Sequence, residues 1–212
     1  MGVVHSKGSC LLSVIVPVHN EEENIVPVIS EIQSILNGKL EYEIVYIDDG
    51  STDKTLKNLS SLTKKLSNLR VYCHDQCYGQ SAALWTWIKH AKGYWIATLE
   101  RDGQNDLHGI IRIIKGRGGP QRLNSKLILC GHRKKRRDSW NKIITSRTAN
   151  FIRNLLLKDR TPDSGCGLKI FPRELFLSLP FFDHMHRFLP LLFLSVAAEV
   201  ESVEVTHRNR LA

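Results

Sequence analysis

The feature that most constrains the fold is a repeated change from buried-strand patterns to helical patterns in the first hundred residues. Residues 12–18, LSVIVPV, form the unbroken β-branched run typical of a strand buried on both faces. Apolar residues then recur at helical spacing over residues 25–36. Strand patterns return at residues 43–47, 69–72 and 94–99, with helical patterns at residues 53–66 and 79–91. Four such units at short spacing predict an α/β fold with a mostly parallel central sheet and helices on both faces.

Polar and acidic segments follow three of the four predicted strands. They are His19-Asn20-Glu21, Asp48-Asp49-Gly50-Ser51 and Glu100-Arg101-Asp102. Because open parallel sheets bind ligands beyond the carboxyl ends of their strands, we expect these segments to meet at one edge and to form a site. Asn20 also precedes a run of three glutamates, which predicts a helix N-cap followed by acids in the first turn.

The second half of the chain is less regular. A short strand is expected at residues 127–130, an amphipathic helix at residues 139–158 and a strand at residues 168–171 after a turn-rich loop. Residues 181–196 are densely apolar, and we expect the aromatic residues there to pack mainly in the core. The longest apolar stretch, residues 189–198, is about half the ~20 residues of a membrane span, so no transmembrane helix is expected. Without a repeat or a linker, we expect one domain over residues 1–212, with residues 1–10 flexible.

Charge is distributed unevenly along the chain. The formal net charge is +9, yet residues 1–110 hold ten Lys and Arg against thirteen Asp and Glu. Residues 131–160 hold ten Lys and Arg against Asp138 and Asp159, a net of +8. Such a segment attracts anionic partners such as lipid headgroups, phosphorylated substrates or nucleic acid, and the alternative is a solvated basic helix.

The acidic segments suit a divalent cation and its phosphate ligands. Glu100 and Asp102 can turn oxygens toward one Mg²⁺ or Mn²⁺, which fills its remaining positions with phosphate oxygens and water. Asp48 and Asp49 have no basic neighbour in sequence and are costly to bury unless they bind something. Ser51 or Asp53 can instead cap the following helix. The five scattered cysteines favour a reducing compartment, and Cys73 and Cys77 are interpreted as ordinary thiols.

Several motifs agree in order with one known family. Val16-Pro17-Val18-His19-Asn20-Glu21, Asp48-Asp49-Gly50-Ser51-x-Asp53 and the acidic element at Glu100 and Asp102 resemble family 2 glycosyltransferases, which have the GT-A nucleotide-diphospho-sugar transferase fold. Residues 98–106, 131–133, 163–169 and 184–188 resemble the dolichol-phosphate mannose synthase branch, which transfers sugars to polyprenyl phosphates. The resemblance covers about residues 12–210.

The resemblance implies roles for individual residues. The nucleotide-binding residues would be Pro17, Asn20, Glu21, Asp48, Asp49 and Gln80. The Mn²⁺ or Mg²⁺ ligands would be Glu100, Asp102 and Gln104, the catalytic residues Asp102, Arg133, Arg147 and Asp163, and the acceptor-phosphate residues Arg133, Arg147, His186, Arg187 and Arg208. Two positions depart from the family pattern: Glu100 replaces the usual aspartate, and Arg101 replaces a small uncharged residue. Relatives also continue beyond the point where this chain ends at Ala212, so it is expected to be either a truncated or a short form.

The resemblance therefore implies a metal-dependent, inverting transfer of a sugar from a nucleotide-diphospho-sugar, either GDP-mannose or a UDP-sugar, to a polyprenyl phosphate. We expect a cytoplasmic protein that is peripheral at the inner face of the membrane, with the anionic membrane surface as a partner. Two alternatives remain open: transfer to a saccharide or lipid A-type acceptor, for which Asp163 would be the base, and binding of nucleotide sugar or membrane without turnover. Nucleic acid is not an expected partner, because the strand and helix order resembles no nucleic-acid module. The motifs leave the donor and the oligomeric state open.

Overall fold

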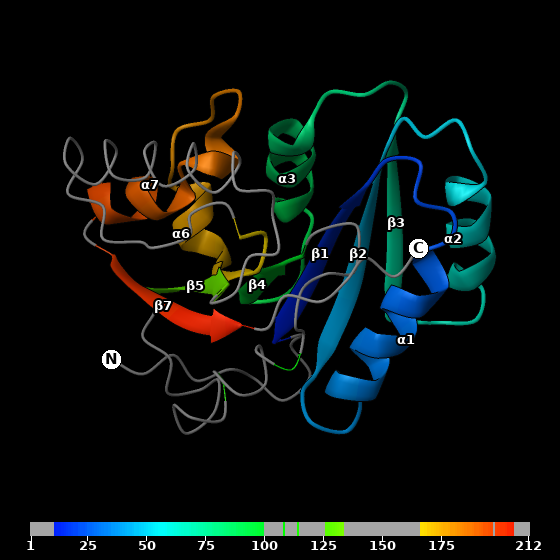
Figure 1. Ribbon diagram of the computed structural model, residues 1–212, viewed down its shortest axis with the longest axis horizontal. Helices are drawn as coiled ribbons and strands as arrows, with labels where there is room; N and C mark the ends of the chain where they lie inside the picture. Colours follow the sequence, from blue (N-terminus) through cyan, green and yellow to red (C-terminus); the bar gives the residue numbers. More distant parts are fainter. Residues whose placement is uncertain are drawn as a thin grey trace.

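A seven-stranded sheet organises the chain. The computed structural model describes residues 11–99, 108, 114, 126–133, 166–196 and 198–205. The strands are β1 (Leu12–Val18), β2 (Tyr42–Asp49), β3 (Leu69–His74), β4 (Trp95–Thr98), β5 (Leu127–Arg133), β6 (Lys169–Pro172) and β7 (Glu199–Val205). Their order across the sheet is β3-β2-β1-β4-β6-β5-β7 (Figure 1). Strands β1 to β4 confirm the four strands expected from the first half of the sequence.

Helices cover both faces of this sheet. They are α1 (Ile25–Leu36), α2 (Thr55–Thr63), α3 (Gln80–Ile88), α6 (Arg173–Leu177), α7 (Leu189–Ser195) and the short 3₁₀ helix η2 (Met185–Arg187). Residues of α1 and α2 share one buried cluster with the sheet, and residues of α3, α6 and α7 share another (Figure 1). The expected α/β architecture with helices on both faces is confirmed. In the described part of the chain, no helix has the length and apolar character that crossing a membrane requires.

The sheet is mostly parallel, with a single reversal at β6. β1 pairs in parallel with β2 and β4, β2 with β3, and β5 with β7. β6 runs antiparallel to both of its neighbours, so Lys169 lies opposite Thr98 of β4 and Cys130 of β5. The reversal therefore places the first residue of β6 beside the carboxyl end of β4.

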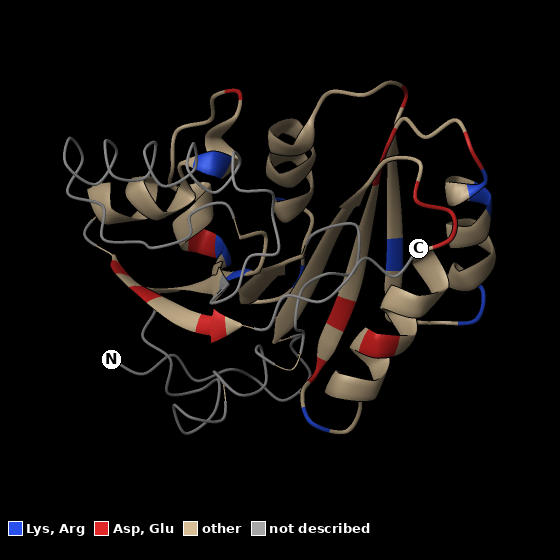
Figure 2. Ribbon diagram, viewed as in Figure 1, with Lys and Arg blue, Asp and Glu red and all other residues tan. Residues whose placement is uncertain are grey.

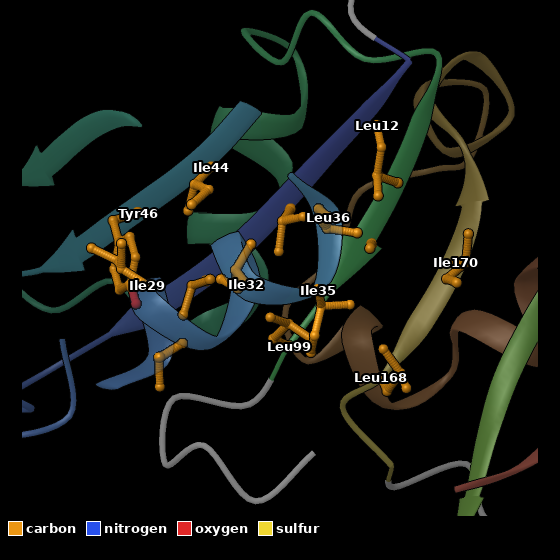
Figure 3. Close-up of a cluster of buried hydrophobic side chains, with 14 of the residues drawn as sticks. Leu12, Ile29, Ile32, Ile35, Leu36, Ile44, Tyr46, Leu99, Leu168 and Ile170 are labelled. Carbon is orange, nitrogen blue, oxygen red and sulfur yellow. The ribbon is translucent and has the colours of Figure 1, made fainter. Parts of the chain in front are cut away.

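The core is built from apolar side chains on the two faces. On one face, Ile32 and Leu36 of α1 pack over Leu12 and Ile44 of the sheet (Figure 3). On the other face, the ring of Phe171 lies 5.3 Å from that of Phe176 and 5.2 Å from that of Phe193. The β-branched run of β1 is buried along its whole length, as a strand between two helical layers requires.

Two features of the chain differ from the sequence predictions. Helix α1 begins at Ile25 with Asn24 at the N-cap position, so the prediction that Asn20 caps it was wrong. Asn20 has a positive φ of 53° and is held in a loop by other partners. Strand β7 was not predicted, because its EVESVEV pattern is mostly polar. β7 is an edge strand, and the red segments of its ribbon in Figure 2 mark its acidic residues. Charged side chains keep such an edge from pairing with other chains.

The burial of α1 predicts that Ile32→Ala destabilises the fold strongly. Ile32 is 1% exposed, so losing its side chain should lower the free energy of unfolding by about 2–5 kcal/mol. Val26, on the same helix, is 54% exposed, and Val26→Ala should change stability by about 0.5 kcal/mol or less. Urea unfolding of the two variants measures the difference, and equal losses would contradict this packing of α1.

Candidate functional site at the carboxyl edge of the sheet

The loops that follow β1 and β2 are bonded to each other. The main-chain N–H of Asn20 donates to Ser51 Oγ at 2.9 Å, and the N–H of Thr52 donates back to Asn20 Oδ1 at 2.8 Å. A second pair of bonds joins Glu22 to Asp53 and Lys54: the N–H of Glu22 donates to Asp53 Oδ2 at 3.3 Å, and the N–H of Lys54 donates to Glu22 Oε2 at 2.8 Å. The prediction that the first two polar segments meet at one edge is confirmed.

His19 joins the same two strands from the side of β1. Its Nδ1–H donates to the main-chain oxygen of Asp49 at 2.8 Å. Nε2 is then the unprotonated nitrogen, and it accepts from Asn20 Nδ2 at 3.3 Å. Asn tolerates a positive φ better than other non-glycine residues, which allows Asn20 to make all these contacts from one loop position.

Asp49 is the most heavily bonded side chain of this edge. Its Oδ1 accepts from His74 Nδ1 at 2.8 Å and from the N–H of Tyr78 at 3.0 Å. Its Oδ2 accepts from the N–H of Gly79 at 2.9 Å and from Cys77 Sγ at 3.2 Å. A carboxylate offers about four lone-pair positions, so these four donors occupy it. The carboxylate therefore ties the end of β2 to the segment that leads into α3.

These bonds also set the protonation of Asp49. Burial by itself would raise the pKa of this carboxyl. The hydrogen bonds from His74, from the N–H of Tyr78, from Cys77 and from the N–H of Gly79 favour the charged form and outweigh burial, so the pKa of Asp49 lies below its ordinary value. Asp49 is thus ionised at neutral pH. Both acids of this motif have partners in the described structure, since Asp48 Oδ1 accepts from the N–H of Ser51 at 3.2 Å.

Gly50 is required by the same close packing. Its φ is +73°, and a Cβ at this position would lie 2.8 Å from the carbonyl carbon of Gln76. Any side chain at this position would push the segment of residues 74–79 away from Asp49. The glycine of the Asp48-Asp49-Gly50-Ser51 motif is thereby explained by the approach of two backbones.

A second group of polar residues lies where η2 meets α3. The Oγ of Ser81, in the first turn of α3, lies 2.7 Å from His186 Nδ1. The main-chain N–H of His186 donates to the same Oγ at 3.3 Å. Burial, with the positive charges of Arg187, Lys169 and His184, lowers the pKa of His186 to about 4. His186 is therefore neutral at physiological pH.

Lys169 is a buried cation of this group. It is 5% exposed, and its Nζ donates to the main-chain oxygen of Cys166. Beside it, Thr98 Oγ1 donates to the main-chain oxygen of Gly167 at 2.7 Å, so β4 and the start of β6 are joined by side chains as well as by the ladder. A buried ammonium group favours an anion nearby.

The structure describes part of the predicted site. Pro17 lies in β1 beyond the residues that pair with β4, so its missing N–H removes no bond from that ladder. Asn20 and Glu21 lie in the loop after β1, Asp48 and Asp49 end β2, exposed Gln80 begins α3, and His186 and Arg187 lie in η2. Arg133 ends β5, and its side chain is not described. Six predicted residues lie outside the described residues: Glu100, Asp102, Gln104, Arg147, Asp163 and Arg208.

The structure brings the described residues into two linked groups. Asn20, Asp48 and Asp49 form one group, and Ser81 and His186 form the other. Gly79 bonds to Asp49 and Ser81 bonds to His186, so only Gln80 separates the two anchor points. Within the described ranges, no three His, Cys, Asp or Glu side chains gather so as to hold a metal ion.

Sequence reasoning missed four residues of these groups. They are His74, Cys77, Ser81 and Lys169. No local pattern marks His74 or Cys77, because their partner Asp49 is more than twenty residues away. Lys169 ends the motif of residues 163–169, and a lysine between apolar residues of a predicted strand was a usable signal.

The aromatic residues near η2 divide into two kinds. Phe193 is fully buried, which confirms the expectation of core packing there. Phe181, Phe182 and Phe188 are between 39% and 48% exposed, so that expectation was wrong for these three. The rings of Phe182 and Phe188 lie 6.2 Å apart, and that of Phe181 lies 5.5 Å from Trp85. We call Phe181, Phe182 and Phe188 the aromatic surface.

A sheet of this order, with bonded polar loops at its carboxyl edge, defines a GT-A-like nucleotide-sugar transferase fold. The family model described as Glycosyl transferase family 2 matches residues 13–179. The chain belongs to that family.

Proteins of known activity resemble most of the chain. A dodecaprenyl-phosphate galacturonate synthase from Rhizobium johnstonii is 30% identical over 204 residues, which cover 94% of this chain and 59% of that protein. An undecaprenyl-phosphate 4-deoxy-4-formamido-L-arabinose transferase from Proteus mirabilis is 27% identical, over 94% of this chain and 60% of that protein. The chain thus spans about three fifths of the length of these relatives.

Solved structures share the fold. Glucosyl-3-phosphoglycerate synthase from Mycobacterium tuberculosis, in complex with Mn²⁺, UDP-glucose and phosphoglyceric acid, superimposes with a TM-score of 0.70 at 22% identity over 96% of this chain and 73% of that one. Mannosyl-3-phosphoglycerate synthase from Rubrobacter xylanophilus superimposes with a TM-score of 0.71 at 19% identity, over 95% of this chain and 68% of that one. Both likenesses support the fold alone.

The bonds to Asp49 predict a pH-dependent loss of stability in Asp49→Asn. The amide cannot accept four donors, so the variant should be less stable by about 1–3 kcal/mol at pH 7. Because the folded-state pKa of Asp49 is lowered, its contribution is fully present above the unfolded value of about 3.9 and is lost as pH falls through the folded value. Urea unfolding at several pH values should show the gap between wild type and variant shrinking below about pH 4.

The exposed acid of the same loop provides the control. Asp75→Asn should change stability by about 0.5 kcal/mol or less at every pH. The proposed role of the Asp49 carboxylate would be contradicted by either of two results. One is a stability difference between wild type and Asp49→Asn that stays constant down to pH 2, and the other is a difference equal to that of Asp75→Asn.

Proposed function

We propose that the chain transfers a sugar, with inversion, from a nucleotide-diphospho-sugar to a polyprenyl phosphate at the cytoplasmic face of a membrane. An acceptor phosphate oxygen attacks the anomeric carbon, the bond from that carbon to the diphosphate breaks, and a nucleoside diphosphate leaves. The two relatives named above are, by their descriptions, transferases for dodecaprenyl and undecaprenyl phosphate, and membership of the same family supports the same acceptor class here.

One structural observation carries the donor half of the proposal. The loops after β1 and β2 are bonded to each other through Asn20, Ser51 and Thr52 at the edge where parallel sheets of this type bind ligands. Asp49 is occupied by four donors, and Asp48 has one described donor, so we assign direct nucleotide contact to Asp48 and Asn20 and a supporting role to Asp49. Pro17, Glu21 and Gln80 complete the proposed nucleotide pocket.

The acceptor half is supported by charge. A lipid phosphate has a second pKa near ~6 and is already an anion near neutral pH, so it can attack without a dedicated base. It needs positive groups that position and desolvate it. Lys169 and Arg187 lie near His186 at η2, and we propose that they act with Arg133, Arg147 and Arg208 on the acceptor phosphate. Asp163 then supports this site instead of serving as the base of a saccharide acceptor.

The proposed metal ligands are Glu100, Asp102 and Gln104. Their oxygen donors fit Mg²⁺ or Mn²⁺, which when bound neutralises the diphosphate leaving group. Leu99, the residue before Glu100, donates its N–H to the main-chain oxygen of Ile15 at 3.1 Å, so the position before the first proposed ligand lies beside β1. Binding of Mn²⁺ with UDP-glucose by the Mycobacterium tuberculosis enzyme, which shares the fold, supports the choice of metal.

The aromatic surface is the proposed contact with the membrane. Exposed aromatic rings suit the boundary between headgroups and acyl chains. Arg187, next to Phe188, and Lys89, 5.4 Å from the ring of Trp85, add positive charge for anionic headgroups. His186 lies in the same short helix as Arg187, so a lipid phosphate bound there would stay close to the bilayer.

Transfer itself tests the proposal. With Mn²⁺ and a labelled GDP- or UDP-sugar, wild-type protein should label undecaprenyl or dolichyl phosphate, and it should not label the matching polyprenol, which lacks the phosphate. Thin-layer chromatography of the lipid product measures transfer. Label on the polyprenol or on a saccharide acceptor, with none on the lipid phosphate, would contradict the proposed acceptor.

A thermal-shift comparison separates donor binding from transfer. A nucleotide diphosphate at about 100 times its dissociation constant adds about 2.7 kcal/mol, which raises Tm by roughly 5–10 °C for a chain of this size. The rise should require Mn²⁺ and should be lost in Asp102→Ala while Asp106→Asn keeps it. A shift that is unchanged in Asp102→Ala would remove Asp102 from the metal site.

Replacement of the aromatic surface should weaken membrane binding. The triple change of Phe181, Phe182 and Phe188 to Ser should reduce co-sedimentation with vesicles of anionic phosphatidylglycerol by about tenfold or more, since each ring contributes roughly 1–2 kcal/mol of burial. Val26→Ser, at a valine exposed on α1, is the matched control and should bind as wild type. Equal binding by the triple variant and wild type, with both folded by circular dichroism, would exclude this surface.

A further inference from the structure

The contact between Ser81 and His186 joins two elements that lie far apart in the sequence. Ser81 is 1% exposed and lies on α3, while His186 lies more than a hundred residues later in η2. Two bonds join them: the 2.7 Å contact between Ser81 Oγ and His186 Nδ1, and the 3.3 Å bond from the His186 N–H to the same Oγ. The hydroxyl thus holds both the backbone and the ring of His186.

This double contact selects one tautomer of the ring. Ser81 Oγ already accepts the N–H of His186, and a buried hydroxyl must also find an acceptor for its own proton. Within the described part of the chain, the acceptor that Ser81 Oγ contacts is His186 Nδ1. The hydroxyl therefore donates to Nδ1, and Nε2 carries the ring proton.

The electrostatic surroundings agree with this arrangement. Arg187 and Lys169 are cations near the ring, His184 lies 6.2 Å away between ring centroids, and Asp183 is the one acid among the charged groups that act on it. Burial and the positive groups hold the pKa of His186 near 4, so the ring is neutral at neutral pH and one of its two nitrogens is unprotonated. Because the Ser81 hydroxyl donates to Nδ1, Nδ1 is the unprotonated nitrogen.

We propose that Ser81 is a positioning residue for the acceptor phosphate, because its hydroxyl holds His186 as the Nε2–H tautomer and leaves Nε2–H to donate to a phosphate oxygen. This inference rests on the proposed transfer to polyprenyl phosphate. It assigns His186 a neutral hydrogen bond to the phosphate, while Lys169 and the arginines supply the charge. It also links the two halves of the site, since Ser81 comes two residues after Gly79, which bonds to Asp49.

Nitrogen NMR of the whole chain tests the tautomer without any need for activity. In ¹⁵N-histidine-labelled protein at pH 7, His186 should show a pyridine-type Nδ1 and a pyrrole-type Nε2, with the signal assigned by its absence in His186→Gln. Ser81→Thr keeps the hydroxyl and should keep this pattern. Ser81→Ala should give a mixture of tautomers. A protonated Nδ1 in wild type, or an unchanged Nε2–H pattern in Ser81→Ala, would overturn the proposal.

Steady-state transfer measures the consequence. Ser81→Ala should raise KM for the polyprenyl phosphate by about two- to tenfold, the effect expected from one hydrogen bond, and should leave KM for the nucleotide sugar unchanged. Ser81→Thr should restore the acceptor KM. Ser34→Ala, which removes an exposed serine hydroxyl on α1, controls for a general effect on the fold. An equal rise of both KM values in Ser81→Ala would indicate a merely structural role and would overturn the positioning role.

The two measurements separate the failure of this inference from the failure of the proposed function. If wild-type protein transfers no sugar to lipid phosphate, the proposed function fails, and the NMR result still decides whether Ser81 sets the tautomer. If transfer occurs and the tautomer does not depend on Ser81, the positioning role fails alone.

Discussion

The carboxylate of Asp49 is the interaction on which the described site depends. Hydrogen-bond donors that all come from residues 74–79 hold the pKa of Asp49 below its ordinary value. The same donors fix the path of the chain between β3 and α3. The close packing at Gly50 allows this approach. Because Gly79 precedes α3 directly, the charge of one buried carboxylate sets where that helix begins. Asp49 is buried and ionised because backbone N–H groups and His74 replace the water it lost.

The reversal at β6 has a consequence of a different kind. If the neighbour of β4 ran parallel to it, the last residue of that neighbouring strand would lie beside the carboxyl end of β4. Here β6 begins at the carboxyl end of β4, so the first residue of β6, Lys169, lies opposite Thr98. A buried cation, Lys169, is thereby placed near His186 on η2.

The sequence predicted the fold better than it predicted the site. Strand β1 and helix α1 were recognisable because burial on both faces and helical spacing leave strong local patterns. The start of α1 was misplaced, since Asn20 has the composition of a cap but its partners lie on the loop after β2. Asp49 was predicted to bind the nucleotide, and none of its four donors in the structure was predicted. Its partners are distant in sequence, and no local periodicity records such contacts.

A neutral histidine among cations has a physical advantage for the proposed reaction. The acceptor phosphate is a monoester with up to two negative charges, and the product is a diester with one. Charged contacts from Lys169 and Arg187 weaken as that charge falls, whereas a neutral N–H donor is affected less. A site made only of cations would hold the acceptor strongly but would orient it poorly, because the attraction of a point charge has little direction. The Nε2–H of His186 adds direction at no cost in further positive charge, and Ser81 is the residue that fixes it.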